Sequence, residues 1–386
     1  MDKKTYCAYP FNSFFLCANG DIKFCCSSRQ SLGNINEQEI DEIMHSPAAT
    51  DVRKKILNNE WHIDNCGLCY EQEKDYSGVS ERLSGEQDYY WETLRGVNSE
   101  EYYKLQRFDL RWSNTCQLAC NYCFDYFSSR WANINGVKVN ANKETSEQKV
   151  INYIGERKSD IVQINLLGGE PLLQKQNKLV FDLLPDAQYY ILTNLSVNLQ
   201  TNPNANKLLS MPNVSWGVSF ETIGDRFEYV RDGAKWEVFS SNIKYVKEQT
   251  GKNLNAHSLW CVYNALNLME FCDYVADSGI INGIYWQAMS SHPALSVFSQ
   301  TDEFKQLALE ELNCCIEKYA DVECIKTDLL INIRDQLVKN LETGEVITGD
   351  LSIETFHEWI DDLEKKLPKK KNMEELWPEI YELYPR

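Results

Sequence analysis

The chain carries three cysteines in one short loop. The segment RWSNTCQLACNYCF places Cys116, Cys120 and Cys123 in the spacing C-x3-C-x2-C. Iron–sulfur clusters are ordinarily held by cysteine thiolates, so these three can bind three irons of a [4Fe-4S] cube and leave the fourth iron open. A structural zinc ion is the alternative, but it takes four protein ligands, and no histidine or further cysteine lies close to the loop in sequence. The spacing therefore favours a cluster with one open iron.

Four further cysteines near the N-terminus form a second potential ligand set. They are Cys7, Cys25, Cys66 and Cys69, in the order C-x12-G-x4-C followed by C-x2-C. Four thiolates would saturate a second [4Fe-4S] cluster and leave no open iron. They also suit a structural zinc ion, because four cysteines that include a C-x2-C pair make a good zinc frame. Cys26 is the alternative ligand at the position of Cys25.

Several of the remaining cysteines are better explained by packing. They lie in strand or helix patterns, where cysteine behaves as a small hydrophobe. These are Cys17, Cys272, Cys314, Cys315 and Cys324.

The composition restricts the classes of function and compartment. The 386 residues include 39 basic and 57 acidic side chains, a formal net charge of -18, which repels nucleic acids and anionic membrane surfaces. The opening residues show neither a sustained apolar run nor a small-residue cleavage site, and no run of about 18 apolar residues is present to span a bilayer. Fourteen cysteines without a secretory signal indicate metal ligands in a reducing compartment, so a cytoplasmic location is expected.

The segments around the first cysteine loop alternate strands with helices. Strands are predicted at 108–112, 162–167, 189–192, 214–220, 257–262 and 283–287, and helices at 144–156, 204–210, 236–249 and 267–278. Six strands with helical connections imply parallel pairing with right-handed crossovers. We therefore predict an α/β fold, a partial (β/α)6 TIM-like barrel, with its chemistry at the carboxyl ends of the strands.

The predicted domain boundaries follow changes in composition. Residues 1–83 are short-stranded, turn-rich and cysteine-rich, and residues 84–104 form a polar, acidic linker. The partial barrel covers 105–291, and 292–386 form a helical C-terminal region with an amphipathic helix over 304–319. The run from Lys365 to Lys371 is interpreted as a solvated helix end followed by a loop around Pro368.

The first cysteine loop, placed after the first predicted strand, resembles the signature of the radical S-adenosylmethionine (SAM) superfamily. The second strand ends in the sequence Gly168-Gly169-Glu170-Pro171, which matches the family's GGEP motif. The resemblance implies that the three cysteines bind the catalytic [4Fe-4S] cluster and that Glu170 binds the methionine ammonium of SAM. It also implies that the glycines let the backbone approach SAM, and that Tyr122 packs near the adenine.

The resemblance extends to the ends of the later strands. It implies further SAM contacts at Asn194, Ser219, Glu221, Arg231 and Val262. Ser219 and Glu221 match positions that hydrogen-bond the ribose hydroxyls, and Arg231 matches an arginine near the SAM carboxylate. Asn194 belongs to a Thr-Asn pair that the family usually follows with glycine, where this chain has Leu195. The resemblance covers about half of the chain, residues 105–291.

The N-terminal cysteines resemble the Twitch half of the SPASM/Twitch auxiliary-cluster domain. The resemblance implies that Cys7, Cys25, Cys66 and Cys69 hold a second, auxiliary [4Fe-4S] cluster, which serves electron transfer or shapes the site. The module departs from the better-known arrangement because it lies before the barrel and not after it.

Together the two resemblances imply a radical SAM enzyme. Its reduced cluster would pass one electron to SAM, and the resulting 5′-deoxyadenosyl radical would abstract a hydrogen atom from a substrate. The expected partners are SAM, an electron donor such as flavodoxin or ferredoxin, and a peptide or protein substrate, with neither nucleic acid nor membrane among them. The alternatives are a small-molecule dehydrogenase of a sugar or cyclitol alcohol, and a non-catalytic iron–sulfur scaffold. The sequence assigns no residue to the chemistry on the substrate itself.

Overall fold

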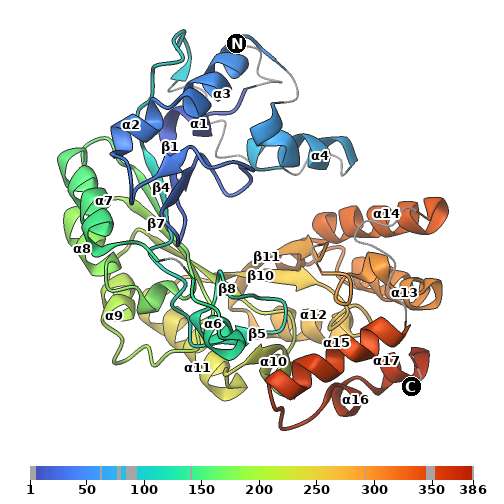
Figure 1. Ribbon diagram of the computed structural model, residues 1–386. Helices are drawn as coiled ribbons and strands as arrows, with labels where there is room; N and C mark the ends of the chain where they lie inside the picture. Colours follow the sequence, from blue (N-terminus) through green and yellow to red (C-terminus); the bar gives the residue numbers. More distant parts are fainter. Residues whose placement is uncertain are drawn as a thin grey trace. The chain divides into compact units, whose positions relative to one another are not determined.

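The computed structural model describes residues 6–60, 63–75, 80–83, 94–139, 141–290, 292–344 and 353–384 (Figure 1). The chain divides into two compact units. Unit 1 comprises Met1–Cys116, Lys138–Leu192 and Pro203–Ser215, and unit 2 comprises Gln117–Val137, Thr193–Asn202 and Trp216–Arg386.

All six predicted strands are present. They are β4 (Arg107–Leu110), β6 (Gln163–Leu166), β7 (Gln188–Thr193), β8 (Val214–Ser219), β10 (Leu254–Trp260) and β11 (Ile281–Ala288). They follow one another in chain order within a nine-stranded sheet, and the β4–β6, β6–β7, β8–β10 and β10–β11 pairings are parallel. Among the described residues this sheet does not close into a barrel. The predicted α/β fold, a partial barrel of parallel strands with helical connections, is confirmed as a mostly parallel sheet that stays open in the described residues.

The other three strands of the sheet come from the cysteine-rich N-terminal segment. β1 (Ser13–Leu16) pairs in parallel with β4, from Ser13 opposite Arg107 to Leu16 opposite Leu110. β2 (Asp21–Lys23) and β3 (Gly33–Asn34) continue the sheet by antiparallel pairing. The rings of Phe14 and Phe108 lie 5.1 Å apart across the β1–β4 pair. Short strands are marginal by themselves, so this segment gains its stability by sharing the core of the parallel sheet.

The turn between β1 and β2 depends on Gly20. Its φ of +91° is one that residues with a side chain rarely adopt, and a Cβ there would lie 2.3 Å from Nδ2 of Asn36. The short helix α1 (Tyr9–Asn12) precedes β1. The helical elements after β3 are α2 (Ile40–Met44), α3 (Pro47–Leu57), η1 (Asp64–Cys66), α4 (Gly67–Asp75) and η2 (Glu81–Leu83).

Two helices of unit 1 were predicted, and they are α7 (Glu144–Glu156) and α9 (Pro203–Leu209). The 3-10 helix η3 (Pro171–Leu173) and the helix α8 (Asn177–Leu183), which lie between β6 and β7, were not predicted. In α7 the buried residues Val150, Ile151 and Ile154 recur at three- and four-residue steps, which places them on one face of the helix.

Unit 2 packs helices on one face of β8, β10 and β11. Buried and partly exposed residues alternate along β10, so Ala256, Ser258 and Trp260 share the buried face. The ring of Phe220 lies 5.0 Å from the ring of Phe239 and 5.0 Å from that of Phe271, which belong to α11 (Trp236–Thr250) and α12 (Leu268–Ser278). Unit 2 also contains α6 (Ser129–Asn135), α10 (Gly224–Val230) and the two-stranded ladder of β5 (Ala119–Cys120) and β9 (Arg231–Asp232).

The C-terminal region is helical, as predicted. It contains η4 (Val297–Ser299), α13 (Asp302–Lys318), η5 (Glu323–Ile325), α14 (Thr327–Thr343), α15 (Ile353–Lys366), α16 (Met373–Leu376) and α17 (Pro378–Leu383) (Figure 1). The domain boundaries proposed from the sequence stay a prediction, and residues 84–93 of the 84–104 linker lie outside the described residues.

Candidate functional site

In unit 1 the GGEP loop packs against the segment that leads into Cys116. A Cβ on Gly169 would lie 2.4 Å from the carbonyl oxygen of Thr115 and 2.6 Å from that of Asn114, so only glycine fits at this approach. Gly168 has a φ of +127°, which a residue with a side chain rarely adopts. The two glycines are therefore required by the close contact between this loop and the backbone that precedes the cysteine.

Glu170 anchors the same contact. Its backbone N–H donates to the Thr115 carbonyl at 2.8 Å, and its fully buried side chain accepts a hydrogen bond from the Leu172 N–H at 3.0 Å, which caps η3. Gln174, also buried, donates to the Thr115 carbonyl at 3.3 Å. The motif thus has a structural function, which is to hold the end of β6 against the residues before Cys116. Pro171 begins η3, where its fixed φ suits the first helical position.

In unit 2 the cysteine loop continues as a strand. Cys120 in β5 lies opposite Arg231 in β9, and Nε1 of Trp131 donates to the Cys120 carbonyl at 2.9 Å. Burial raises the pKa of the Cys120 thiol, and the nearby Arg231 charge opposes this. Burial and the neighbouring Cys120 raise the pKa of the Cys123 thiol to about 12. Cys120 is buried and Cys123 is half-buried. Neighbouring thiols in such surroundings do not ionise readily unless a cation compensates, so the surroundings suit a metal–thiolate site.

Tyr122, Glu221 and Arg231 form a buried cluster in unit 2. The Glu221 Oε2 atom accepts hydrogen bonds from Arg231 at 2.6 Å and from the Tyr122 hydroxyl at 3.1 Å, and the side chains of the ion pair are 0% (Glu221) and 5% (Arg231) exposed. Burial alone would lower the pKa of Arg231, but the charges of Glu221, Tyr122 and Cys120 raise it above its usual value. Oε1 of Glu221 and Nε of Arg231 are buried without a hydrogen-bond partner. The cluster therefore retains one acceptor and one donor that a bound polar ligand can satisfy.

The structure explains the departure at Leu195. Asn194 follows β7, where its Oδ1 accepts hydrogen bonds from Gln117 at 3.0 Å and from the Ser196 N–H at 3.0 Å. Leu195 has a φ of +51°, the left-handed conformation that favours glycine, and its side chain is fully buried. The family's glycine corresponds to this backbone conformation, which here is stabilised by the burial of a leucine side chain.

The other predicted positions also lie in unit 2. Ser219 ends β8 opposite His257 of β10 and is partly exposed. Val262 is buried after β10, and its N–H donates to the Leu295 carbonyl at 3.0 Å. Nearby, Asn264 donates to the Glu221 carbonyl at 3.2 Å, which links the end of β10 to the buried cluster.

The four N-terminal cysteines lie in unit 1, where Cys7 and Cys69 are buried and Cys25 and Cys66 are half-buried. Cys7 precedes α1, Cys25 follows β2, and Cys66 and Cys69 lie at the junction of η1 and α4. Burial raises the pKa of the Cys7 thiol well above its usual value, and the nearby Cys66 and Cys25 add to the rise. Burial likewise raises the pKa of Cys66 to about 12, with contributions from Cys25 and Cys69. The thiols thus lie within electrostatic range of one another, as ligands of one centre do.

A cluster and a single zinc ion require different spacings of the four thiols. A tetrahedral zinc ion with Zn–S bonds of about 2.3 Å holds its sulfurs about 3.8 Å apart, whereas each thiolate of a cube binds a different iron and lies further from the others. In the described part of the chain, no three His, Cys, Asp or Glu side chains lie close enough to hold one metal ion.

The bonding state and the exposure of the other cysteines complete the description of the thiols. All fourteen cysteines are free, which agrees with metal ligation and packing and not with a disulfide framework. Cys25 and not Cys26 is the neighbour that raises the pKa of Cys7 and Cys66, and Cys26 is exposed. Cys17, Cys272 and Cys315 are buried. Cys314 is exposed on α13, and Cys324 is half-buried.

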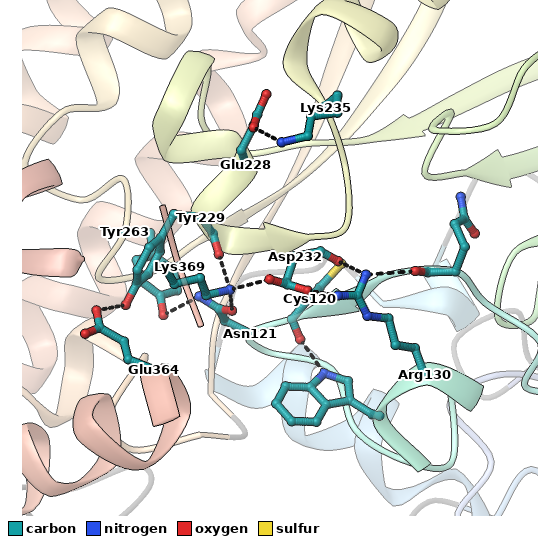
Figure 2. Close-up of polar contacts among 12 residues, drawn as sticks. Cys120, Asn121, Arg130, Glu228, Tyr229, Asp232, Lys235, Tyr263, Glu364 and Lys369 are labelled. Carbon is teal, nitrogen blue, oxygen red and sulfur yellow. Dashed lines mark hydrogen bonds and ion pairs between the residues drawn. The ribbon is translucent and has the colours of Figure 1, made fainter. Parts of the chain in front are cut away.

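Lys369 is a residue whose position the sequence did not reveal. The run 365–371 was expected to be solvated, but the Lys369 side chain is only 5% exposed. Its Nζ atom donates to Oδ1 of Asn121 at 3.2 Å, next to Cys120 in sequence (Figure 2). The expectation of a fully solvated run is wrong at this residue, because one lysine among five turns inward and finds acceptors there. No local sequence pattern separates Lys369 from its exposed neighbour Lys370.

None of the helices in the described residues has the length and apolar character needed to cross a bilayer.

Family models match two parts of the chain. Residues 7–70 match the SPASM model, described as an iron-sulfur cluster-binding domain, and residues 110–274 match the radical SAM superfamily. A comparison with curated protein sequences gives no match.

Solved structures resemble the chain at low identity. The structure of anSMEcpe with bound AdoMet is 14% identical, with a TM-score of 0.45 over 62% of this chain and 67% of that chain. SuiB of Streptococcus suis bound to S-adenosylmethionine is 14% identical, with a TM-score of 0.41 over 72% of this chain and 60% of that chain. The chain thus spans less than two thirds of the length of SuiB.

The two cysteine sets fall within the two matched segments, Cys7 to Cys69 in one and Cys116 to Cys123 in the other. The chain is therefore a member of the radical SAM superfamily, with a radical SAM domain that binds a [4Fe-4S] cluster and SAM, and with a SPASM domain that binds an auxiliary iron–sulfur cluster.

Proposed function

We propose that this protein is an oxidoreductase-type radical SAM enzyme that cleaves SAM reductively and takes a hydrogen atom from a peptide or protein substrate. The observation that carries the proposal is that the C-x3-C-x2-C loop and the GGEP loop both lie within the radical SAM match and are joined by the hydrogen bond from the Glu170 N–H to Thr115. When bound, the cluster and SAM supply one-electron cleavage of the sulfonium and a 5′-deoxyadenosyl radical.

The proposed roles of this chain's residues follow from their surroundings. Cys116, Cys120 and Cys123 would hold the catalytic cluster, and Glu170, on the loop shaped by Gly168, Gly169 and Pro171, would bind the SAM ammonium. In unit 2 the residues proposed to contact SAM are Tyr122, Asn194, Ser219, Glu221, Arg231 and Val262. The orphan Oε1 of Glu221 supports this, because it is a buried acceptor that a ribose hydroxyl would satisfy.

For Arg231 the contacts specify a role more closely than the sequence did. Its Nη2 atom is already paired with Glu221 at 2.6 Å, so the guanidinium is neutralised by a carboxylate of the same chain. Nε is buried and without a hydrogen-bond partner. We propose that Arg231 orients Glu221 and Tyr122 and offers Nε as a donor to the SAM carboxylate.

Cys7, Cys25, Cys66 and Cys69 are proposed as the ligands of an auxiliary [4Fe-4S] cluster. Four thiolates leave no iron open, so its proposed role is electron transfer or shaping of the substrate site. The neighbourhood of α4 is held in place by a buried ion pair between Glu73 and Arg82, and Arg82 also donates to the Tyr6 carbonyl at 3.4 Å, one residue before Cys7. Because Arg82 links α4 to the residue before Cys7, these contacts support a proposed cluster site whose ligands are held in fixed positions.

The SPASM domain supports the proposal of a peptide substrate, because enzymes with this auxiliary module commonly modify peptides. The second candidate is a small-molecule dehydrogenase acting on a sugar or cyclitol alcohol. It is favoured by the neutral polar row formed by Ser219, His257 and Tyr285, which the strand register aligns across β8, β10 and β11.

We further propose flavodoxin or ferredoxin as electron donor, and a cytoplasmic location because fourteen free thiols require a reducing compartment.

The test of the activity is the formation of 5′-deoxyadenosine. Anaerobic, reconstituted protein with SAM and dithionite is expected to release it, and a variant with Cys116, Cys120 and Cys123 all replaced by alanine should not. If wild type and variant behave alike, the radical SAM proposal is wrong and the scaffold alternative stands. Deuterated peptides or polyols that transfer deuterium into 5′-deoxyadenosine then distinguish the two substrate classes.

The role of Glu170 has a test of its own. Glu170→Gln keeps an oxygen that can accept the Leu172 hydrogen bond but removes the charge that would face the ammonium. A charge-assisted hydrogen bond contributes roughly 1.5 to 3 kcal/mol, so SAM should bind about ten- to a hundredfold more weakly. Isothermal titration with SAM measures this, and an unchanged affinity would leave Glu170 with only its capping role.

A further inference from the structure

Lys369 is a buried lysine in the segment that joins α15 to α16. It follows Pro368, three residues after α15 ends at Lys366, and its side chain is 5% exposed. The adjacent Lys370 is exposed. Burial lowers the pKa of Lys369, and Asp232 opposes this by raising it. Burial of a lysine costs free energy unless its ammonium is fully hydrogen-bonded, so the contacts at this position need an explanation.

The ammonium of Lys369 has three acceptors, and all belong to the surroundings of Cys120. It donates to Oδ1 of Asn121 at 3.2 Å, to the Tyr229 carbonyl at 2.9 Å and to Oδ2 of Asp232 at 3.3 Å (Figure 2). Asn121 in turn donates to the Tyr263 hydroxyl at 3.0 Å and is 4% exposed. The residue that follows Cys120 is therefore fixed from both sides, once by the C-terminal segment and once by the end of β10.

Asp232 extends the contact to the other side of Cys120. It lies opposite Ala119 in the β5–β9 ladder and forms an ion pair with Arg130 as well as with Lys369. Arg130 also donates to the Gln117 carbonyl at 3.2 Å. Figure 2 shows the two cations on opposite sides of the one carboxylate. Lys369 and Arg130 thus share the Asp232 carboxylate. Each also binds a residue outside β5, namely Asn121 for Lys369 and Gln117 for Arg130.

An apolar contact accompanies the polar one. Leu363 and Leu367 of the C-terminal region pack with Ala119 and Trp131, and Cys123 packs against this cluster. Glu364 accepts hydrogen bonds from the Tyr229 hydroxyl at 2.9 Å and from the Met373 N–H at 2.8 Å. The tyrosine whose carbonyl binds Lys369 is thereby also fixed by α15. The C-terminal helices therefore support the cysteine loop by two independent kinds of contact.

We propose that Lys369 is a positioning residue for the catalytic cysteine loop, which it fixes through Asn121 and Asp232 and whose cluster it supplies with a nearby positive charge. The proposal rests on the proposed function only in treating Cys120 as a cluster ligand. A cation close to an iron–sulfur cluster stabilises the more negative, reduced state and so raises the reduction potential. The C-terminal region would then influence the potential of the cluster through the charge of Lys369, in addition to its apolar contact with the cysteine loop.

The first experiment uses the full-length apo protein and does not depend on a cluster. Hydrogen exchange followed by mass spectrometry should show peptides that cover 117–123 exchanging about ten- to a hundredfold faster in Lys369→Met, because a charged hydrogen-bond network there is lost. Lys370→Met is the matched control and should exchange as the wild type does. Equal rates in Lys369→Met and wild type, or faster exchange throughout the chain, would overturn the proposal.

The second experiment measures the reduction potential of the reconstituted catalytic cluster by EPR-monitored titration. Lys369→Met should lower the potential, Asp232→Asn should raise it, and Lys369→Arg should restore most of the wild-type value. A merely structural role would shift the two variants in the same direction or not at all, which would contradict the proposal. If the wild-type protein binds no cluster and forms no 5′-deoxyadenosine, the proposed function fails, while the exchange result still decides the positioning of the loop.

Discussion

Glu221 and Arg231 form an ion pair that is almost entirely inaccessible to solvent. Removing one member of such a pair leaves a buried charge without compensation, which costs about 3 to 5 kcal/mol, whereas replacing both members by apolar groups is often close to neutral. We expect Glu221→Gln to lower the free energy of unfolding of the apo protein by about 3 kcal/mol and Glu221→Leu/Arg231→Met to recover most of the loss. Urea denaturation measures both. A Glu221→Gln loss below about 1 kcal/mol would show that Arg231 is compensated by other groups.

His257 makes the stability of unit 2 depend on pH. Burial lowers its pKa to about 4, and its ring stacks on Tyr285 with centroids 5.0 Å apart. An unfolded histidine titrates near about pH 6.5, so between these values the unfolded chain binds a proton that the folded chain does not. The contribution of neutral His257 to the free energy of unfolding is therefore complete above about pH 6.5, and it is lost as the pH falls toward 4.

The matching variant isolates this effect from other groups that titrate in the same range. From pH 7 to pH 5 the wild-type free energy of unfolding should fall by up to about 2 kcal/mol more than that of His257→Gln. Chemical denaturation of the apo proteins at both pH values provides the comparison. Parallel pH dependences in the two proteins would rule out this role for His257.

Among the elements, the GGEP loop after β6 gives the sharpest steric prediction. A methyl group on Gly169 would meet two backbone carbonyls at 2.4 and 2.6 Å, and backbone cannot move aside as a flexible side chain can. Gly169→Ala should therefore destabilise the protein by at least about 2 kcal/mol and reduce iron retention by the adjacent cysteine loop. Gly155, inside α7, is the control, because a Cβ there would lie at an ordinary contact distance of 3.6 Å from Leu183. Gly155→Ala should therefore raise the free energy of unfolding by up to about 1 kcal/mol. Thermal melting and iron analysis test the pair, and a neutral Gly169→Ala would mean that the loop shifts at little cost.

The same elements show what the sequence could predict. Strands, helices and the GGEP motif are local patterns, and α7 has the predicted bounds of Glu144–Glu156. The pairing of β1 with β4 joins residues about 94 positions apart by register, such as Ser13 with Arg107, and no local pattern encodes it. Lys369 was misinterpreted for a related reason, because its acceptors come from Asn121 after β5, from β9 and from α10, which are distant in sequence. Predictions from one sequence were accurate where the signal was local or matched a family motif, and they failed where tertiary contacts decide.

For the molecule as a whole, the two cysteine sets predict two clusters in one chain. If both are [4Fe-4S] cubes, anaerobic reconstituted protein should contain about 8 irons per chain and negligible zinc, since each cube has four irons. About 4 irons with one zinc would instead assign a structural zinc site to the N-terminal segment. Elemental analysis with protein quantification decides between these outcomes.

Single substitutions assign the irons to their sites. Cys25→Ala should lose about 4 irons, because it removes one of the four proposed ligands of the N-terminal cluster. Cys26→Ala should keep all of them, because Cys26 is exposed and is not among the neighbours that raise the pKa of Cys7 and Cys66. Cys314→Ala, an exposed thiol on α13, controls for the loss of a surface cysteine. Metal binding contributes to the folding of small cysteine-rich segments, but here β1 shares the sheet with β4, so the N-terminal segment has a source of stability besides the metal. We therefore expect Cys25→Ala to remain folded by circular dichroism and to keep its catalytic cluster. Global unfolding of this variant would show that the auxiliary centre, and not the shared sheet, is what holds the N-terminal segment in place.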